Sequence, residues 1–282
     1  MNVEIMKQDV VSKILECFNE NGIESRGNNF EDCILQWMDI CDKRIAAKKR
    51  KVVFSKELQE KINNNSIDSE TIRLINVFKS KFEEGNDICP YLSKNIKKPT
   101  SIDYLLTIWR IHHLHLNEKI VGDMCERSDK YILFMIHNEV VYFLDLTKHL
   151  SGKEFASRYL LNILENNNWL DYVSIYRSSE IKNVSYEITS DEEMFNFWKS
   201  NINYFVYKLG ESYYTNINGL TCAGTSLNNQ LNICNLNKSL FRASQNDSIS
   251  YSRTKIDIKM LKLTIYIFAN NKEQAWITIE GE

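Results

Sequence analysis

Apolar side chains recur every three or four residues along much of the first hundred positions, the spacing that lines one side of an α-helix. The pattern predicts four helices, over residues 3–21, 29–49, 56–62 and 70–83. Signals for the start and the end of a helix agree with three of these helices. Asn21-Gly22 ends the first helix, Ser55 can cap the start of the third, and Gly85 ends the fourth. Residues 1–100 are therefore expected to form a helical N-terminal region.

The pattern changes after Pro99. A short helix is predicted for Ser101–Trp109, and the alternation in Ile111–Leu116 predicts a strand with His113 and His115 on one face. Two aliphatic and aromatic runs, joined at residues 137–139, then predict a β-hairpin. Strict alternation in its second strand would place Val140, Tyr142, Leu144 and Leu146 on one face, and Val141, Phe143, Asp145, Thr147 and His149 on the other. A helix over 153–165 completes this region, 101–166, as a small antiparallel sheet with flanking helices.

The asparagine run 166–168 predicts a boundary to the last region, 167–282. Asp191 is positioned to cap a helix that extends to Phe205, and residues 219–239, rich in Asn, Thr, Ser and Gly, indicate a loop with short helical pieces. The final residues alternate and turn at Asn270-Asn271, which predicts a C-terminal hairpin. The expected fold class is α+β: a helical region packed on a small antiparallel sheet, followed by a second α+β region ending in a β-hairpin.

The amino-acid composition of the chain limits the classes of protein to which it can belong. The chain of 282 residues is 43% hydrophobic and 26% charged, which is typical of a soluble globular protein. No stretch has the roughly 20 apolar residues of a membrane span, and the N-terminus lacks the pattern of a secretory signal. We therefore expect a cytoplasmic protein with no membrane partner. The seven cysteines are scattered without the close pairs of zinc sites, so we expect them to be small buried side chains.

The net charge of −2 is small, but the cations are unevenly placed. Lys48, Lys49, Arg50 and Lys51 are consecutive and follow Lys43-Arg44 closely. Such a run can bind phosphates, which makes these four residues candidates for contact with nucleic acid. A solvated helix end is the structural alternative.

All five histidines lie between residues 112 and 149. Histidine titrates near neutral pH and is a common metal ligand, so this stretch is the candidate working site. His113 and His115 could share a metal if Asp145 or His149 supplied a further ligand. The spacing Arg110-x4-His115 also matches the Arg-x4–6-His pattern of HEPN-type ribonucleases, which requires both residues on a helix.

A third interpretation is a metal-independent ribonuclease. RNA cleavage through its own 2′-hydroxyl needs a base, an acid and cations that hold the phosphate. His113, His115 and His149 are candidates for the acid and base. Arg127, just before the first hairpin strand, is the candidate phosphate clamp.

The order of these features resembles the sheet of the RelE/ParE/HigB toxin superfamily. The matching positions are Leu114, Arg127, the hairpin runs 132–136 and 140–146, and His149. The resemblance covers roughly residues 105–165, about a fifth of the chain. In that superfamily an arginine opens an earlier strand and an apolar hairpin ends in a catalytic His or Tyr, which implies a ribonuclease role for Arg127 and His149. Superfamily members are small and usually basic, whereas this chain is long and slightly acidic.

The sequence thus predicts a toxin-like ribonuclease of a toxin–antitoxin or phage-defence system. It would need no metal and no cofactor, and its partners would be RNA and an antitoxin or another defence protein. Three alternatives remain: a non-enzymatic regulatory module that binds nucleic acid or protein, a HEPN-type ribonuclease that uses Arg110 and His115, and histidines that are purely structural on an edge strand.

Overall fold

The structure is a computed structural model that describes residues 1–98, 101–148 and 152–281. The chain divides into two compact units. Unit 1 combines residues 1–47, 94–101 and 228–282, and unit 2 combines residues 48–93 and 102–227. These bounds differ from the three consecutive regions expected from the sequence, because unit 1 is assembled from segments far apart in the chain. Each unit is described by itself.

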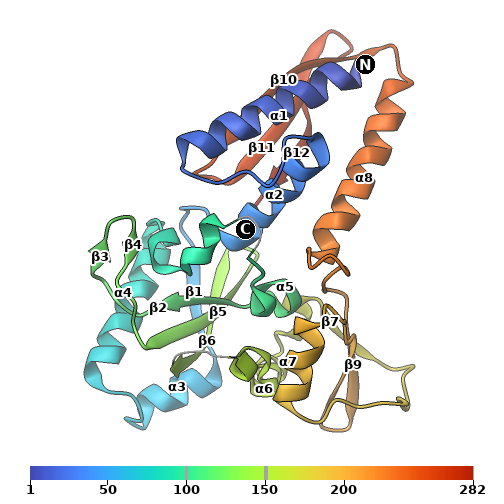
Figure 1. Cartoon of the computed structure of the whole chain (residues 1–282). Coiled ribbons are helices and arrows are strands. Elements are labelled where there is room, and N and C mark those ends of the chain that lie inside the picture. The colour runs from blue at the N-terminus through green and yellow to red at the C-terminus, as the bar shows by residue number, and fades with distance from the viewer. Residues whose placement is uncertain (99–100, 149–151, 282) are drawn as a thin grey trace. The chain divides into compact units, whose positions relative to one another are not determined.

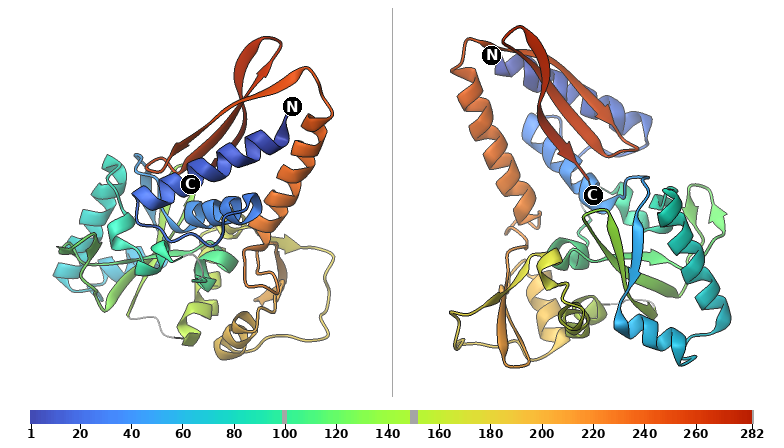
Figure 2. Two further views of the ribbon diagram at one scale, coloured as in Figure 1. Left: turned by 45° about the horizontal axis from the view of Figure 1, so that its top comes forward. Right: turned by 180° about the vertical axis from the view of Figure 1, so that it is seen from behind.

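Unit 1 packs helices against a three-stranded antiparallel sheet of order β10-β11-β12. Its elements are α1 (Val3–Glu20), α2 (Phe30–Lys43), η2 (Lys94–Lys97), α8 (Leu227–Ser244), β10 (Ile249–Asp257), β11 (Lys262–Ala269) and β12 (Lys272–Glu280). Figures 1 and 2 show α1 lying along this sheet. Trp37 of α2 and Leu263 and Ile265 of β11 are fully buried in the shared core, so the sheet covers the apolar stripes of helices made at the other end of the chain.

Unit 2 is organised around a mixed sheet of order β1-β6-β5-β2, in which β1 runs parallel to β6 and the other neighbours are antiparallel. The strands are β1 (Lys51–Phe54), β2 (His112–His115), β5 (Lys130–His137) and β6 (Val140–Lys148). On one face Phe134 and Phe143 meet Phe82 of α4 (Ser69–Glu84), with ring centroids 5.4 and 5.8 Å away. On the other face Leu133 and Leu144 join a core that includes α5 (Tyr104–Trp109) and α6 (Arg158–Asn166). The sheet is thus covered on both sides.

The rest of unit 2 contains a second sheet of order β7-β9-β8. Its strands are β7 (Ile175–Ser178), β8 (Val206–Leu209) and β9 (Ser212–Asn216), and β3 (Ile120–Val121) pairs with β4 (Met124–Cys125). The remaining helical elements are α3 (Lys56–Asn63), η1 (Cys89–Tyr91), η3 (Gly152–Ala156), η4 (Leu170–Val173) and α7 (Asp191–Lys199). Trp109 and Trp198 lie edge to face at 4.8 Å and join the second sheet to α5 and α7.

The α+β fold class is confirmed, and most predicted elements are present. The helices of the first hundred residues serve both units, since α1 and α2 pack with the C-terminal sheet whereas α4 packs on the mixed sheet. The predicted helix 29–49 ends early at Lys43, because Arg44 has extended backbone angles and the chain then leads into β1. The predicted helix 153–165 is divided between η3 and α6, and the helix that starts at Asp191 ends at Lys199 rather than continuing to Phe205.

One C-terminal prediction needs correction, and another is confirmed and extended. Residues 219–239 were expected to be mainly loop, yet residues 227–244 form one helix, α8, whose Ile233, Leu236 and Leu240 are buried. Tertiary burial of this apolar stripe outweighs the weak helix propensity of the Asn and Ser residues around it. The predicted hairpin over β11 and β12 is present, with its turn at Asn270-Asn271, and β10 adds a third strand.

Within the ranges that the structure describes, no helix combines the length and the apolar character needed to cross a lipid bilayer.

Candidate functional site

Three neighbouring strands bring the predicted histidine site together. His113 and His115 of β2 pair with Leu133 and Tyr131 of β5, which in turn pair with Asp145 and Thr147 of β6. Residues directly opposite each other in antiparallel strands project from the same face. One face of the sheet therefore carries a row of side chains with acid–base or hydrogen-bonding capacity: His113, His115, Tyr131, Asp145 and Thr147.

A β-bulge decides which side of β6 faces this row. The register shifts after Leu133↔Asp145, so that Phe134 pairs with Phe143 and Leu144 is the extra residue. The strict alternation expected from the sequence is therefore wrong across this point. Phe143 lies with the aromatic cluster on the far face, whereas Asp145 and Thr147 share the histidine face.

Ser55 supports the bulge. Its backbone N–H donates to the carbonyl of Phe143 at 2.9 Å, and its hydroxyl donates to the carbonyl of Leu144 at 2.6 Å. The same hydroxyl oxygen accepts from the N–H of Leu58 at 3.0 Å and so caps α3. One buried side chain thus links the bulge to the start of the helix that carries Lys61.

His115 is buried beneath Tyr131, with the ring centroids 4.5 Å apart. Its Nδ1 accepts a hydrogen bond from the backbone N–H of Ser128 at 3.4 Å. An Nδ1 that accepts leaves the proton of the neutral ring on Nε2, so this contact selects the tautomer. The same hydrogen bond places Ser128, the residue after Arg127, against the imidazole of His115.

His113 is the more accessible of the two, although its side chain is only 12% exposed. Its Nδ1 lies 3.8 Å from Oδ2 of Asp103, whose other oxygen accepts from the N–H of Leu106 at 3.1 Å and caps α5. A carboxylate held in this way attracts the protonated imidazole and can orient it. The rings of Tyr131 and Phe155 lie 5.8 and 6.1 Å from the His113 ring.

Arg127 is exposed in the segment between β4 and β5, three residues before Lys130. Lys130 pairs with Lys148 in the hairpin register, so the start of β5 and the end of β6 lie side by side, as predicted. The side chains of Lys130 and Lys148 alternate with those of Tyr131 and Thr147 and so project from the far face, where Lys130 Nζ lies 2.7 Å from Asp68 Oδ2 and from Thr71 Oγ1. Arg127 is therefore the cation that this end of the sheet offers near His115. His149, the residue after Lys148, lies outside the described residues. The predicted proximity of His149 and Arg127 thus stays a prediction.

The basic run does not form one exposed surface. Lys49 and Lys51 are exposed, whereas Lys48 pairs with Oε1 of Glu139 at 2.6 Å. Arg50 is only 3% exposed and donates through Nη1 to the carbonyl of Lys48 at 3.4 Å. A direct contact of all four side chains with nucleic acid would require Arg50 to leave this environment.

The Arg110-x4-His115 spacing does not have the helical geometry of a HEPN site. Helix α5 ends at Trp109, Arg110 has left-handed backbone angles, and His115 lies on β2. Metal ligation by His113 and His115 is not supported either. In the described ranges, His, Cys, Asp and Glu side chains nowhere come together in groups of three or more that could hold an ion.

Sequence reasoning missed an ion pair that lies on the same face. Lys61 Nζ is 2.8 and 2.6 Å from the two carboxylate oxygens of Asp145, whose side chain is 4% exposed. Burial opposes the charge of Lys61, but the hydrogen bonds and charge of Asp145 outweigh it and raise the pKa of the lysine. The Tyr159 ring lies 5.7 Å from Lys61 Nζ. Lys61, Asp145 and Tyr159 line a pocket of about 560 Å³, which Leu133 and Thr147 also line.

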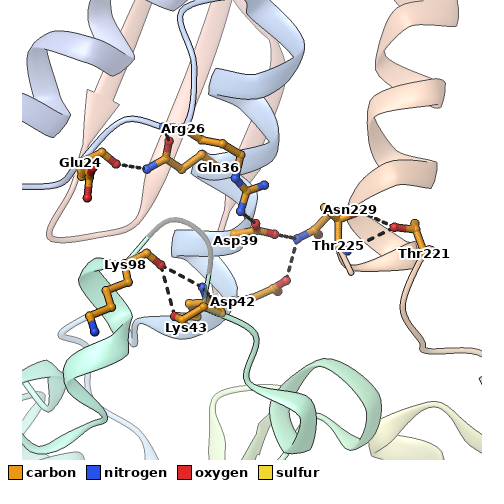
Figure 3. Close-up of polar contacts among 11 residues, drawn as sticks. Glu24, Arg26, Gln36, Asp39, Asp42, Lys43, Lys98, Thr221, Thr225 and Asn229 are labelled. Carbon is orange, nitrogen blue, oxygen red and sulfur yellow. Dashed lines mark hydrogen bonds and ion pairs between the residues drawn. The ribbon is translucent and has the colours of Figure 1, made fainter. Parts of the chain in front are cut away.

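Unit 1 contains a separate polar cluster. Asn229 of α8 donates through Nδ2 to both Asp39 and Asp42 of α2, each at 2.9 Å (Figure 3). Arg26 Nη2 pairs with the other oxygen of Asp39 at 2.7 Å, and Gln36 accepts from the Arg26 N–H at 2.6 Å. The two hydrogen bonds from Asn229 hold the N-terminal part of α8 against α2.

Comparisons of the chain with protein-family models, with curated proteins and with solved structures find no match. The function therefore has to be argued from the site itself.

Proposed function

We propose that the protein is a metal-independent endoribonuclease that acts in the cytoplasm as the toxin-like component of a toxin–antitoxin or phage-defence system. The observation that supports this is the row of His113, His115, Tyr131, Asp145 and Thr147 on one sheet face, with the exposed Arg127 in the segment that leads into β5. Cleavage through the 2′-hydroxyl of RNA needs these kinds of group and no metal.

In this proposal the His113 imidazole, with Asp103 beside it, removes the proton from the 2′-oxygen. The 2′-oxygen attacks phosphorus, the bond from phosphorus to the 5′-oxygen breaks, and a 2′,3′-cyclic phosphate forms. A second group, His115 or His149, returns a proton to the leaving 5′-oxygen. Arg127, which is exposed, stabilises the charge that builds on the phosphate.

The test is cleavage of a labelled RNA by the purified protein in the presence of a chelator. His113→Ala should lower the cleavage rate by roughly 10²–10⁴-fold, and so should either His115→Ala or His149→Ala, as expected for a lost acid or base. Arg127→Ala should lower the rate and weaken its dependence on salt. His137→Ala is the matched control, because His137 stacks on Tyr172 at 4.4 Å at the other end of β5.

Stable variants of His113, Arg127 and His149 that all cleave RNA at the native rate would contradict the proposal. RNA binding without cleavage by the native protein would instead indicate the non-enzymatic binding module. An antitoxin partner is tested separately, by asking whether a neighbouring gene product relieves the toxicity of the expressed protein.

A further inference from the structure

A pocket lies next to the histidine row, and most of the side chains that line it have no part in the proposed cleavage chemistry. It has a volume of about 560 Å³, within the range of small-ligand sites. Leu133, Leu146 and Leu160 give it apolar walls, and Glu154, Asp191 and Glu192 bring carboxylates to its lining. All of these residues belong to unit 2.

The charges around the pocket disfavour a phosphate. Two lysines line it, Lys61 and Lys153, against four carboxylates. The charge of Lys61 is already balanced by Asp145, which it contacts through both oxygens. Arg158 lies outside the lining and pairs with Asp191, at 3.9 Å. The larger number of carboxylates in the lining disfavours a phosphate, whereas a neutral ligand with N–H donors would find an acceptor in Glu192.

Tyr159 provides a flat surface at the same pocket. Its side chain is 45% exposed, so the ring is open to a ligand. Desolvation and the nearby Asp145 charge raise the pKa of its phenol, which keeps the hydroxyl protonated. An exposed aromatic ring beside an apolar wall is the usual platform on which proteins stack a nucleobase.

We propose that this pocket binds a nucleobase of the RNA substrate, with guanine preferred, by stacking on Tyr159 and by donation to the carboxylate of Glu192. The Watson–Crick edge of guanine presents two adjacent donors, N1–H and the 2-amino group, which match the two oxygens of one carboxylate. Uracil presents one N–H between two carbonyl oxygens, which a carboxylate repels. The inference rests on the proposed ribonuclease function and names the base that this same site selects.

The pocket is close enough to the histidine row to serve one substrate. Asp145 and Thr147 both line the pocket, and Thr147 is also opposite Tyr131, the ring that covers His115. Leu133, which also lines the pocket, pairs with both His113 and Asp145. A base in the pocket would thus leave its sugar and phosphate beside the histidine row.

The experiment measures binding of guanosine, cytidine, uridine and inorganic phosphate to the full-length protein by calorimetry, independently of cleavage. Guanosine should bind at least about tenfold more tightly than uridine, since each bidentate contact to a base gives discrimination of this order. Tyr159→Ala should weaken guanosine binding by roughly 5- to 100-fold, the loss of one stacked ring. Glu192→Gln should remove the preference for guanosine over uridine.

Matched controls are Tyr176→Ala, which removes a 43% exposed tyrosine on β7, and Glu180→Gln, which removes an exposed carboxylate outside the pocket. Neither should change guanosine binding. Equal affinity for guanosine and uridine, tighter binding of phosphate, or native affinity in the Tyr159 variant would each overturn the proposal. Guanosine binding without RNA cleavage would reject only the ribonuclease function, whereas cleavage without base preference would reject only the pocket assignment.

Discussion

The four described histidines lie in environments that suit them to different tasks. His112 is buried and stacks on Phe134 at 5.2 Å, on the face away from the pocket. His113 has a carboxylate beside it, His115 is covered by Tyr131, and His137 lies against Tyr172. Proximity in sequence therefore does not make these residues equivalent, and only His113 and His115 face the candidate site.

His112 should make the stability of the protein depend on pH. Its burial, with smaller contributions from nearby cations, lowers its pKa from 6.5 to about 3. The unfolded chain binds the proton first as the pH falls below 6.5, so the free energy of unfolding should decrease between pH 6.5 and about 3, by up to about 1.4 kcal/mol per pH unit. Urea denaturation at pH 7 and pH 5 should show a difference of about 2 kcal/mol from this residue.

His112→Leu should lose this part of the pH dependence, because no titrating group remains at that position. His137→Leu, at a half-exposed histidine, is the control and should keep it. An identical loss of stability between pH 7 and pH 5 in both variants would show that other groups cause it.

The sequence could predict the face shared by His113 and His115, because alternation in a strand follows from local geometry. It could not predict the partner of Asp145. Lys61 is 84 positions away in the chain, and nothing in its own helix distinguishes it from an exposed lysine. Similarly, the exposed Tyr159 gains a role only when α6 is placed beside the sheet.

At the level of elements, the β5–β6 hairpin was predictable from its apolar runs and its turn, but the bulge was not. The bulge depends on Ser55, which precedes β6 by about ninety residues and supplies the donors for two carbonyls at that point. Without the bulge, Asp145 would project with Phe143 into the aromatic cluster. Tertiary contacts, rather than the local sequence, therefore decide which side chains of β6 face the pocket.

Ser55→Ala should be more destabilising than the removal of an ordinary helix cap. It removes the cap of α3, worth about 1 kcal/mol, and leaves the buried carbonyl of Leu144 without its hydroxyl donor, a cost of about 1–3 kcal/mol. Chemical denaturation should therefore show a total loss of about 2–4 kcal/mol. Ser190→Ala, which removes only the cap of α7, is the control and should cost about 1 kcal/mol or less.

A Ser55 variant as stable as the Ser190 variant would mean that the bulge does not rely on this hydroxyl. Hydrogen exchange of the Leu146 amide, which donates to Asp145 at 2.8 Å, reports separately on the geometry after the bulge.

Helix α8 was missed because its signal is not local. Its asparagines favour turns when they are considered alone, yet Asn229 is 5% exposed and joins two carboxylates of α2 (Figure 3). Asp39 and Asp42 lie almost two hundred positions earlier in the chain. A polar residue that looks like a loop former can thus be part of a helix when its partners come from elsewhere.

At the level of the whole molecule, three consecutive regions are expected from the sequence, whereas the structure divides into two units that are both discontinuous in the chain. The strand and helix patterns were sufficient for the α+β class. The sequence could not predict which elements pack on which. Helices α1 and α2 and strands β10–β12 are typical amphipathic elements, and each could have packed on a nearer neighbour in the chain. Only the shared burial of residues such as Trp37 and Leu263 identifies them as one core.

Removal of residues 246–282 should therefore disrupt unit 1 far from the cut. The deletion takes away β10–β12 and exposes the buried side of α1, including Met6, Val10 and Ile14. Hydrogen exchange should become fast for the amides of α1 and α2, while those of β5 and β6 stay protected as an internal reference. Continued protection of α1 in the shortened chain would contradict the assignment of these elements to one cooperative core.

The discontinuity of unit 1 also has a consequence during translation. Residues 48–227, apart from 94–101, supply all of unit 2, whereas α1 and α2 are synthesised early and have no sheet to pack on until β10–β12 have left the ribosome. During that interval their apolar stripes are available to chaperones, and a chain that stops short of β10 keeps them exposed. The closing of this sheet therefore separates chains that still expose these apolar stripes from chains that have buried them.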